Sequence, residues 1–297
     1  PPVVFLPGTM IRALQPSRDR FDAVLFDLDG TLLDRRGRVT ARTYSALRRL
    51  VDAGLEVILC TGRSVGGTLS VHRALELETP LCCYNGSWIG HPGRRPWHVQ
   101  AIPDPLLGEI EVTESLSRFF FRHTGDRKHT VRRAHPQYDK VVTWYENVVQ
   151  VRDLSRLPRT RLMRVSCYFD GADESAAAWD AMSEDAHAVL TLQHSPMAIF
   201  PEFEGLDLYL GEIQPTTKGK AEIFDWLEAE RGIPASRTIA VGDQRNDLSM
   251  LDAAGLAVVV ENAVEDARRY ADLVIGHHDQ EGVARWIEAG MPTGEVS

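Results

Sequence analysis

Cysteine is scarce in this sequence, with four residues in 297. That is too few for a disulfide framework, and no C-x-x-C spacing indicates a zinc site around Cys60, Cys82, Cys83 or Cys167. All but Cys83 lie in or beside apolar strand-like runs, so we expect those three to be small core residues. A reducing, cytoplasmic location is the expectation that follows.

Long apolar runs and an excess of basic residues are also missing. No stretch approaches the roughly 18 apolar residues of a membrane helix, and Val3–Leu6 is too short for a signal sequence. The 33 Lys and Arg against 42 Asp and Glu give a formal charge of −9, which argues against nucleic-acid binding. We expect a soluble globular protein without nucleic-acid or membrane partners; the oligomeric state stays open.

The pattern from Phe21 to Gly86 predicts alternating strands and helices, which is typical of a parallel sheet with helices on its faces. The expected strands are Ala23–Phe26, Leu55–Cys60 and Pro80–Tyr84, and the expected helices are Thr40–Val51 and Val65–Leu77. The same rhythm resumes later, with strands at 206–210, 238–241 and 257–260 and helices at 220–231, 246–254 and 264–270.

The segment between these stretches has a mixed α+β pattern. It predicts helices at 104–123 and 172–187 and strand-like alternation at 141–151, 162–169 and 189–193. We therefore predict a doubly wound, Rossmann-like α/β core, residues 21–86 and 206–297, with an inserted α+β cap domain at 87–205. Residues 1–20 form an N-terminal extension of unknown role.

Acidic and polar residues follow several of the expected core strands. Asp27-Leu28-Asp29-Gly30-Thr31 follows the first strand, Thr61-Gly62-Arg63 the second, and Gly242-Asp243 with Asn246-Asp247 a later one. Lys218-Gly219 comes just before a helix. Ligands of open α/β sheets bind outside the carboxyl ends of the strands, so we expect these groups to converge.

These four motifs, in this order, resemble those of the haloacid dehalogenase superfamily, and the resemblance covers about Phe21–Ile287. About a hundred and fifty residues separate the second and third motifs, which places the cap as in the Cof-like group of sugar-phosphate phosphatases. The segments 84–86 and 261–263 also look like that group. Asp29 disfavours dehalogenation, because displacement of halide needs no acid for the leaving group.

The resemblance implies a small phosphorylated substrate and Mg²⁺ as the cofactor. Asp27 would be the nucleophile that forms an aspartyl-phosphate, and Asp29 the acid and then the base. The implied metal ligands are the Asp27 and Asp243 side chains and the Asp29 backbone carbonyl, with Asn246 and Asp247 holding the ion or its waters from outside.

Two side chains are expected to stabilise the substrate phosphate. They are Thr61 and Lys218, with the backbone N–H groups of Leu28 and Gly62 as further donors. Lys220 is the neighbouring competitor of Lys218, which we prefer because it matches the motif. Arg63 and Asp34 are expected to make structural hydrogen bonds in their loops.

The cap region is rich in basic residues. Residues 118–164 carry twelve Lys and Arg against four Asp and Glu, so this window could attract an anionic substrate. A solvated basic surface is the stronger alternative. We expect Trp144, Tyr145 and Tyr168 to pack in the core, and His277-His278 to lie in a surface loop without a metal.

The predicted function is Mg²⁺-dependent hydrolysis of a small phosphorylated metabolite, most plausibly a sugar phosphate. The alternatives are a phosphomutase of the phosphomannomutase type and a non-catalytic phosphosugar-binding regulator. The regulator predicts a lost nucleophile or metal ligand, whereas Asp27, Asp29 and Asp243 are present. A nucleic-acid end phosphatase is disfavoured by the acidic remainder of the chain.

Overall fold

The computed structural model describes residues 21–113, 116, 120–124, 127–131, 135–144, 148–153, 161–199 and 203–291. They divide into two compact units, which we call the core and the cap. Of the described residues, the core contains those up to Arg63, Thr68–His98 and those from Lys218 onward, and the cap contains Ser64–Gly67 and those within Val99–Thr217. The sequence predicted cap boundaries at 87 and 205, whereas this division puts the main part of the cap at Val99–Thr217.

The core is built on one sheet of eight strands in the order β14-β13-β12-β1-β2-β3-β4-β5. Pairing is parallel from β14 to β3, and β4 pairs antiparallel with β3. Their bounds are β1 Ala23–Phe26, β2 Glu56–Cys60, β3 Leu81–Cys83, β4 Trp88–Gly90, β5 His98–Val99, β12 Thr238–Gly242, β13 Leu256–Val260 and β14 Leu273–Ile275.

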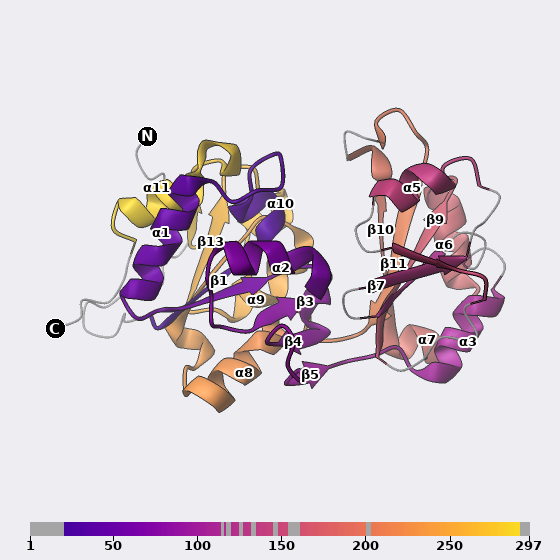
Figure 1. Ribbon diagram of the computed structural model, residues 1–297, viewed down its shortest axis with the longest axis horizontal. Helices are drawn as coiled ribbons and strands as arrows, with labels where there is room; N and C mark the ends of the chain where they lie inside the picture. Colours follow the sequence, from indigo (N-terminus) through magenta and orange to yellow (C-terminus); the bar gives the residue numbers. More distant parts are fainter. Residues whose placement is uncertain are drawn as a thin grey trace. The chain divides into compact units, whose positions relative to one another are not determined.

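Alternate strand residues pack against helices on the two faces of this sheet, as expected for buried parallel strands. Residues such as Leu25, Ile58 and Val259 form one cluster with α8 Glu222–Arg231, α9 Leu248–Ala253 and α10 Glu265–Arg268. The helices α1 Ala41–Asp52 and α11 Gly282–Glu288 lie side by side on the other face (Figure 1). Helix α2 Val65–Ala74 belongs to the core from Thr68 onward.

Helix α1 shows why the sequence signal was clear. The Thr40 hydroxyl accepts a hydrogen bond from the Thr43 amide, which satisfies a helix-end donor that would otherwise be unpaired. Thr43, Ala46, Leu47 and Leu50 form the buried stripe at helical spacing. This helix confirms the prediction at 40–51 to within one residue.

The cap is a second, six-stranded sheet in the order β10-β11-β9-β6-β7-β8. Its strands are β6 Phe120–Thr124, β7 Arg127–Val131, β8 Val148–Val151, β9 Leu162–Phe169, β10 Leu190–Pro196 and β11 Tyr209–Pro215, antiparallel except for β7 with β8. Its helices are α3 Asp104–Val112, α5 Tyr138–Trp144, α6 Ala172–Asp180 and α7 Glu184–Val189. The mixed α+β composition predicted for the insert is confirmed.

Several predicted cap elements differ from the observed ones. The helix expected at 104–123 ends at Val112, and its last residues belong to strand β6. The alternation at 141–151 divides into helix α5 and strand β8. The strand expected to restart the core at 206–210 is β11, which pairs with β9 and β10 inside the cap sheet. Apolar runs of this length fit either structure, and tertiary packing decides.

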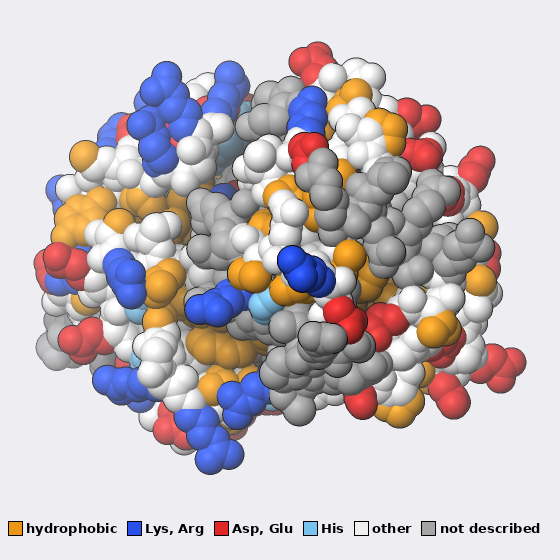
Figure 2. Space-filling view, turned by 45° about the vertical axis from the view of Figure 1, so that its right-hand side comes forward, with side chains coloured by type: hydrophobic (Ala, Val, Ile, Leu, Met, Phe, Trp, Pro, Cys, Tyr) orange, Lys and Arg blue, Asp and Glu red, His pale blue; other side chains and the backbone are white. Residues whose placement is uncertain are grey.

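Cysteine and aromatic residues that were predicted to lie in the core can be checked directly. All four cysteines are buried free thiols, and Tyr168 and Trp144 pack in a cap cluster with Phe203, as predicted. The extension 1–20, Tyr145, and Arg118, Arg132, Arg133, Arg156 and Arg159 of the basic window lie outside the described residues. On the face in Figure 2, described Lys and Arg side chains occur in small scattered groups. In the described part of the chain, no helix has the length and apolarity required to cross a bilayer.

Candidate active site

The order of strands in the core sheet brings distant segments together. Strand β1 pairs with β2 on one side and with β12 on the other, which is the point where the strand order reverses. Asp27, Thr61 and Asp243 directly follow these three strands. The Asp27 amide donates to the Val241 carbonyl at 2.9 Å, which continues the β1–β12 ladder to the first site residue.

A lysine holds two of the carboxylates in the buried interior. Lys220 Nζ donates to Asp27 Oδ1 and to Asp247 Oδ1, each at 2.5 Å. The Lys220 side chain is 0% exposed, and the carboxylates are 6% and 0% exposed. Lys220 lies in the helical turn Gly219–Ala221, just ahead of α8. This cation is therefore fixed beside the predicted nucleophile.

The preference for Lys218 over Lys220 is contradicted by this geometry. The Lys218 side chain is 60% exposed and pairs with Asp225 at 2.6 Å on the surface of α8. Residues two apart on a helical turn point in nearly opposite directions, so only one lysine can reach the carboxylates. Helical spacing could have identified Lys220 as the buried lysine. It lies on the same helical stripe as three buried residues, Ile223, Phe224 and Leu227.

Asp243 and Asp247 are held by a second set of hydrogen bonds. Thr31 Oγ1 donates to Asp243 Oδ1 at 2.8 Å, which joins the loop after β1 to the loop after β12. Asp247 Oδ2 accepts the amides of Asp243 and Gln244 at 2.8 and 2.9 Å. Both Asp247 oxygens are thus occupied by protein donors, so Asp247 positions the cluster and Lys220.

Asp29 lies apart from these buried carboxylates. Arg63 donates to both of its oxygens, with Nε at 2.7 Å and Nη2 at 2.5 Å, a bidentate ion pair. The Asp29 side chain is 58% exposed and that of Arg63 is 30% exposed. Arg63 was expected to make a structural hydrogen bond, and this one fixes the predicted acid–base group. Asp34 accepts the amides of Arg36 and Arg38 within its loop, as expected.

The predicted phosphate donors lie around the same strand ends. Thr61 is buried, and its hydroxyl accepts the Arg63 amide at 3.1 Å. Gly62 packs beside Asn85, since a Cβ at this position would lie 3.1 Å from Asn85 Oδ1. Leu28 is fully buried in the turn that follows β1.

Asn246, which is predicted to support the metal from outside, makes a hydrogen bond through its side-chain amide. Its Nδ2 donates to Asn85 Oδ1 at 3.0 Å, so its amide braces the segment after β3. Asn262, in the loop after β13, likewise donates its side-chain amide to another loop, with Nδ2 2.8 Å from the Gly30 carbonyl. Sequence reasoning gave no role to Asn85, Asn262 or Thr31, although the first two lie in segments that resembled the Cof-like group.

Burial and mutual repulsion change the protonation of this cluster. Burial raises the pKa of Asp27 well above its ordinary value; Lys220 opposes this, while Asp247, Asp243 and Asp29 add to it. Burial, with Asp247, raises the pKa of Asp243 to about 6. Burial alone would lower the pKa of Lys220, but Asp247 and Asp27 raise it above normal. Lys220 therefore stays charged, but its single positive charge does not neutralise the carboxylates around it.

The donor set fits a hard divalent cation. Carboxylate oxygens of Asp27, Asp243 and Asp247 lie within 4.8 Å of one another and are buried. Three carboxylates against the one ammonium of Lys220 leave two negative charges, which a divalent ion would neutralise. Oxygen-only ligands are those that Mg²⁺ prefers. Asp247 is fully buried and accepts three hydrogen bonds, whereas Asp243 Oδ2 has only a 3.3 Å bond from the Gln244 amide, so Asp27 and Asp243 are better suited to direct ligation.

Comparison with known proteins identifies the family. The sequence model of the haloacid dehalogenase-like hydrolase family matches residues 24–287 of this chain. The chain is similar to the phosphatase YwpJ of Bacillus subtilis, 27% identical over 281 residues, covering 89% of this chain and 98% of that protein. It is also similar to the pyridoxal phosphate phosphatase YbhA of Escherichia coli, 27% identical over 274 residues, covering 89% and 96%.

A solved structure supports the same fold. A haloacid dehalogenase-like hydrolase from Bacteroides thetaiotaomicron superposes with a TM-score of 0.76 at 22% identity, covering 91% of this chain and 99% of that one. The α/β core with its α+β insert is therefore the architecture of this family. The chain belongs to the haloacid dehalogenase-like hydrolases and, among them, to the Cof-like phosphatases, which hydrolyse phosphoric monoesters.

Proposed function

We propose that this enzyme hydrolyses a small phosphorylated metabolite, most plausibly a sugar phosphate, through an aspartyl-phosphate on Asp27 and with Mg²⁺ as cofactor. The observation that carries the proposal is the buried cluster of Asp27, Asp243 and Asp247 around Lys220. It joins a fixed nucleophile to a place for a cation. The E. coli relative acts on a small phosphate ester, which supports this substrate class.

The first step needs an oriented carboxylate. Lys220 holds Asp27 Oδ1, which leaves Oδ2 as the oxygen that attacks phosphorus while the P–O bond to the leaving group breaks. Asp29 would give a proton to the leaving oxygen and later remove one from the water that hydrolyses the aspartyl-phosphate. Arg63 sets the position of Asp29 through two parallel hydrogen bonds.

Charge stabilisation is the main requirement of phosphoryl transfer. Lys220 takes the role first assigned to Lys218, next to Asp27, and the Thr61 hydroxyl with the Leu28 and Gly62 amides would donate to phosphate oxygens. Asp27, Asp243 and the Asp29 carbonyl would hold Mg²⁺, which supplies charge neutralisation for the phosphoryl oxygens when bound. The other residues keep these groups in place.

The test is a phosphate-release screen over sugar phosphates, pyridoxal phosphate and nucleotides, with and without Mg²⁺. We expect Mg²⁺-dependent release by the wild type and none by Asp27→Asn. Borohydride reduces an aspartyl-phosphate side chain to an alcohol. Peptide mass spectrometry should find this reduced side chain at Asp27 only. Wild-type turnover by Asp27→Asn, or isomer formation in place of phosphate release, would contradict the proposal.

A further inference from the structure

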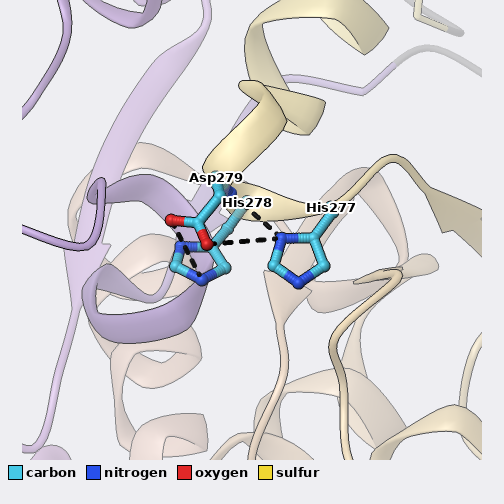
Figure 3. A group of neighbouring side chains, drawn as sticks. All are labelled: His277, His278 and Asp279. Atoms are coloured by element: carbon cyan, nitrogen blue, oxygen red, sulfur yellow. Dashed lines mark hydrogen bonds and ion pairs between the residues drawn. The ribbon is translucent and has the colours of Figure 1, made fainter.

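His277, His278 and Asp279 form a second cluster, in the turn between β14 and α11 (Figure 3). The sequence predicted a surface loop, but these side chains are only 30%, 15% and 15% exposed. One ligand atom from each lies within 4.8 Å of the others. In Figure 3 the Asp279 carboxylate lies next to the His278 ring, and the Nδ1 side of the His277 ring faces that carboxylate.

The hydrogen bond behind His278 determines which nitrogen faces the cluster. His278 Nδ1 lies 2.9 Å from the Leu33 carbonyl, which can only accept, so Nδ1 carries the proton of the neutral ring. Nε2 then presents a lone pair to Asp279 Oδ1 at 3.6 Å. This separation is too long for a hydrogen bond, so the Nε2 lone pair is available to a cation that Asp279 Oδ1 would also contact.

His277 presents an acceptor to the same place. Its Nδ1 accepts the Asp279 amide at 3.2 Å and lies 3.9 Å from Asp279 Oδ2. Two ligands that are each about 2.1 Å from a tetrahedral ion are separated by about 3.4 Å. The observed separations of 3.6 and 3.9 Å are within a few tenths of an ångström of that value. Closing on an ion therefore needs shifts of a few tenths of an ångström, and the ion would have to replace the Asp279 amide at the single lone pair of His277 Nδ1.

We propose that His277, His278 and Asp279 bind a divalent transition-metal ion, of which Zn²⁺ is the best fit. Two imidazoles and one carboxylate suit Zn²⁺ in preference to Mg²⁺, whereas the Asp27 cluster offers only oxygen. The carbonyl bond on His278 Nδ1 is the outer contact that metal-binding histidines commonly make. The inference is independent of the proposed function, because it concerns other residues and a binding measurement tests it.

Arg35 is the built-in competitor at this site. Its guanidinium forms an ion pair with Asp279 Oδ2 while its side chain stays 80% exposed. Exposed ion pairs contribute little free energy, so the metal ion can displace this one. Removing the arginine should therefore tighten metal binding, which no role as a simple surface loop predicts.

The cluster is connected to the turn that carries Asp29. The His278 amide donates to Asn262 Oδ1 at 3.1 Å, and Asn262 Nδ2 donates to the Gly30 carbonyl at 2.8 Å. His278 also contacts the Leu33 carbonyl at the other end of that turn. A bound ion would thus stabilise both ends of the turn through one histidine.

The experiment measures Zn²⁺ binding to the full chain by calorimetry, after chelator treatment and in excess Mg²⁺. Asp243→Asn serves as the background, so that the Asp27 cluster does not compete. We expect one equivalent of Zn²⁺, an affinity at least about tenfold weaker in His277→Gln and His278→Gln, and a tighter one in Arg35→Ala. His187→Gln, on an exposed cap helix, is the matched control and should bind as its background does.

Cobalt provides a second readout that does not depend on stability. Co²⁺ at this site should show a visible absorption band that both histidine substitutions remove. Unchanged Zn²⁺ affinity in both histidine variants, with native circular dichroism, would overturn the proposal. So would a background protein that binds no Zn²⁺.

Discussion

At the scale of single residues, the sharpest prediction concerns Lys220, which takes the role that the sequence assigned to Lys218. Lys220→Met removes a buried cation from Asp27 and Asp247, so kcat should fall by about 10²–10³-fold. Stability should also fall by about 3–5 kcal/mol, because two buried carboxylates lose their partner. Steady-state kinetics and thermal unfolding measure the two effects.

Lys218→Ala is the matched control for this substitution. It removes an exposed ion pair with Asp225, which contributes little free energy. We expect kcat within about twofold of the wild type and an unchanged unfolding temperature. The reverse ranking of the two variants would restore the assignment that the motif favoured.

Site residues were predictable where a strand dictated their place. Asp27, Thr61 and Asp243 each follow a buried parallel strand, and such strands present their carboxyl ends at one edge. The contact of Asn246 with Asn85 was not predictable, because the two residues are 161 positions apart in sequence. Side-chain pairings between distant loops depend on local turn geometry, which apolar periodicity does not report.

At the scale of elements, the turn after β1 depends on a glycine. Gly30 has φ +79°, and a Cβ there would lie 2.4 Å from Asp243 Oδ2. Gly30→Ala should therefore displace the Asp243 carboxylate and lower both Mg²⁺ affinity and kcat. Stability should fall by about 1–2 kcal/mol from the left-handed backbone alone. Activity as a function of Mg²⁺ concentration and thermal unfolding test this.

Gly54→Ala is the control that separates backbone strain from the clash between a Cβ at position 30 and the Asp243 carboxylate. Gly54, just beyond the end of α1, has φ +84°, but a Cβ added there would meet no other part of the described chain within 4 Å. We expect a similar loss of stability with unchanged Mg²⁺ affinity. Equal losses of Mg²⁺ affinity in the two variants would mean that contact with Asp243 is irrelevant.

The core elements were easier to predict than those of the cap. In the core, strands and helices alternate with clear ends such as the Thr40 cap, so β1, β2, α1 and β12 were placed to within about one residue. Strand β6 was read as helix because a short aromatic run suits either structure. Strands β4 and β5 were missed because three and two residues carry no usable period.

At the scale of the whole molecule, pH couples metal binding to stability. The pKa of Asp243 is raised from 3.8 to about 6, so between these values the folded chain retains a proton that the unfolded chain has released. The metal-free protein therefore loses stability as pH rises through this window. Mg²⁺ needs the ionised carboxylate, so its stabilising effect should grow over the same range.

The measurement is the rise in unfolding temperature caused by saturating Mg²⁺. It should be small near about pH 5 and reach its full value above about pH 7. In Asp243→Asn the rise should be small at both pH values, because a carboxylate ligand of the ion is gone. An equal rise at both pH values in the wild type would contradict the coupling.

The pairing of β1 with β12 also has a consequence during protein synthesis. Phe26 is in register with Val241, and the entire cap is encoded between them. While the ribosome is still translating the cap, β1 has no neighbour on that edge, and Asp27 has neither its lysine nor its partner carboxylates. A nascent chain therefore cannot be catalytically competent until the segment that carries β12, Asp243 and Asp247 has emerged, and until then an exposed strand edge is what chaperones would meet.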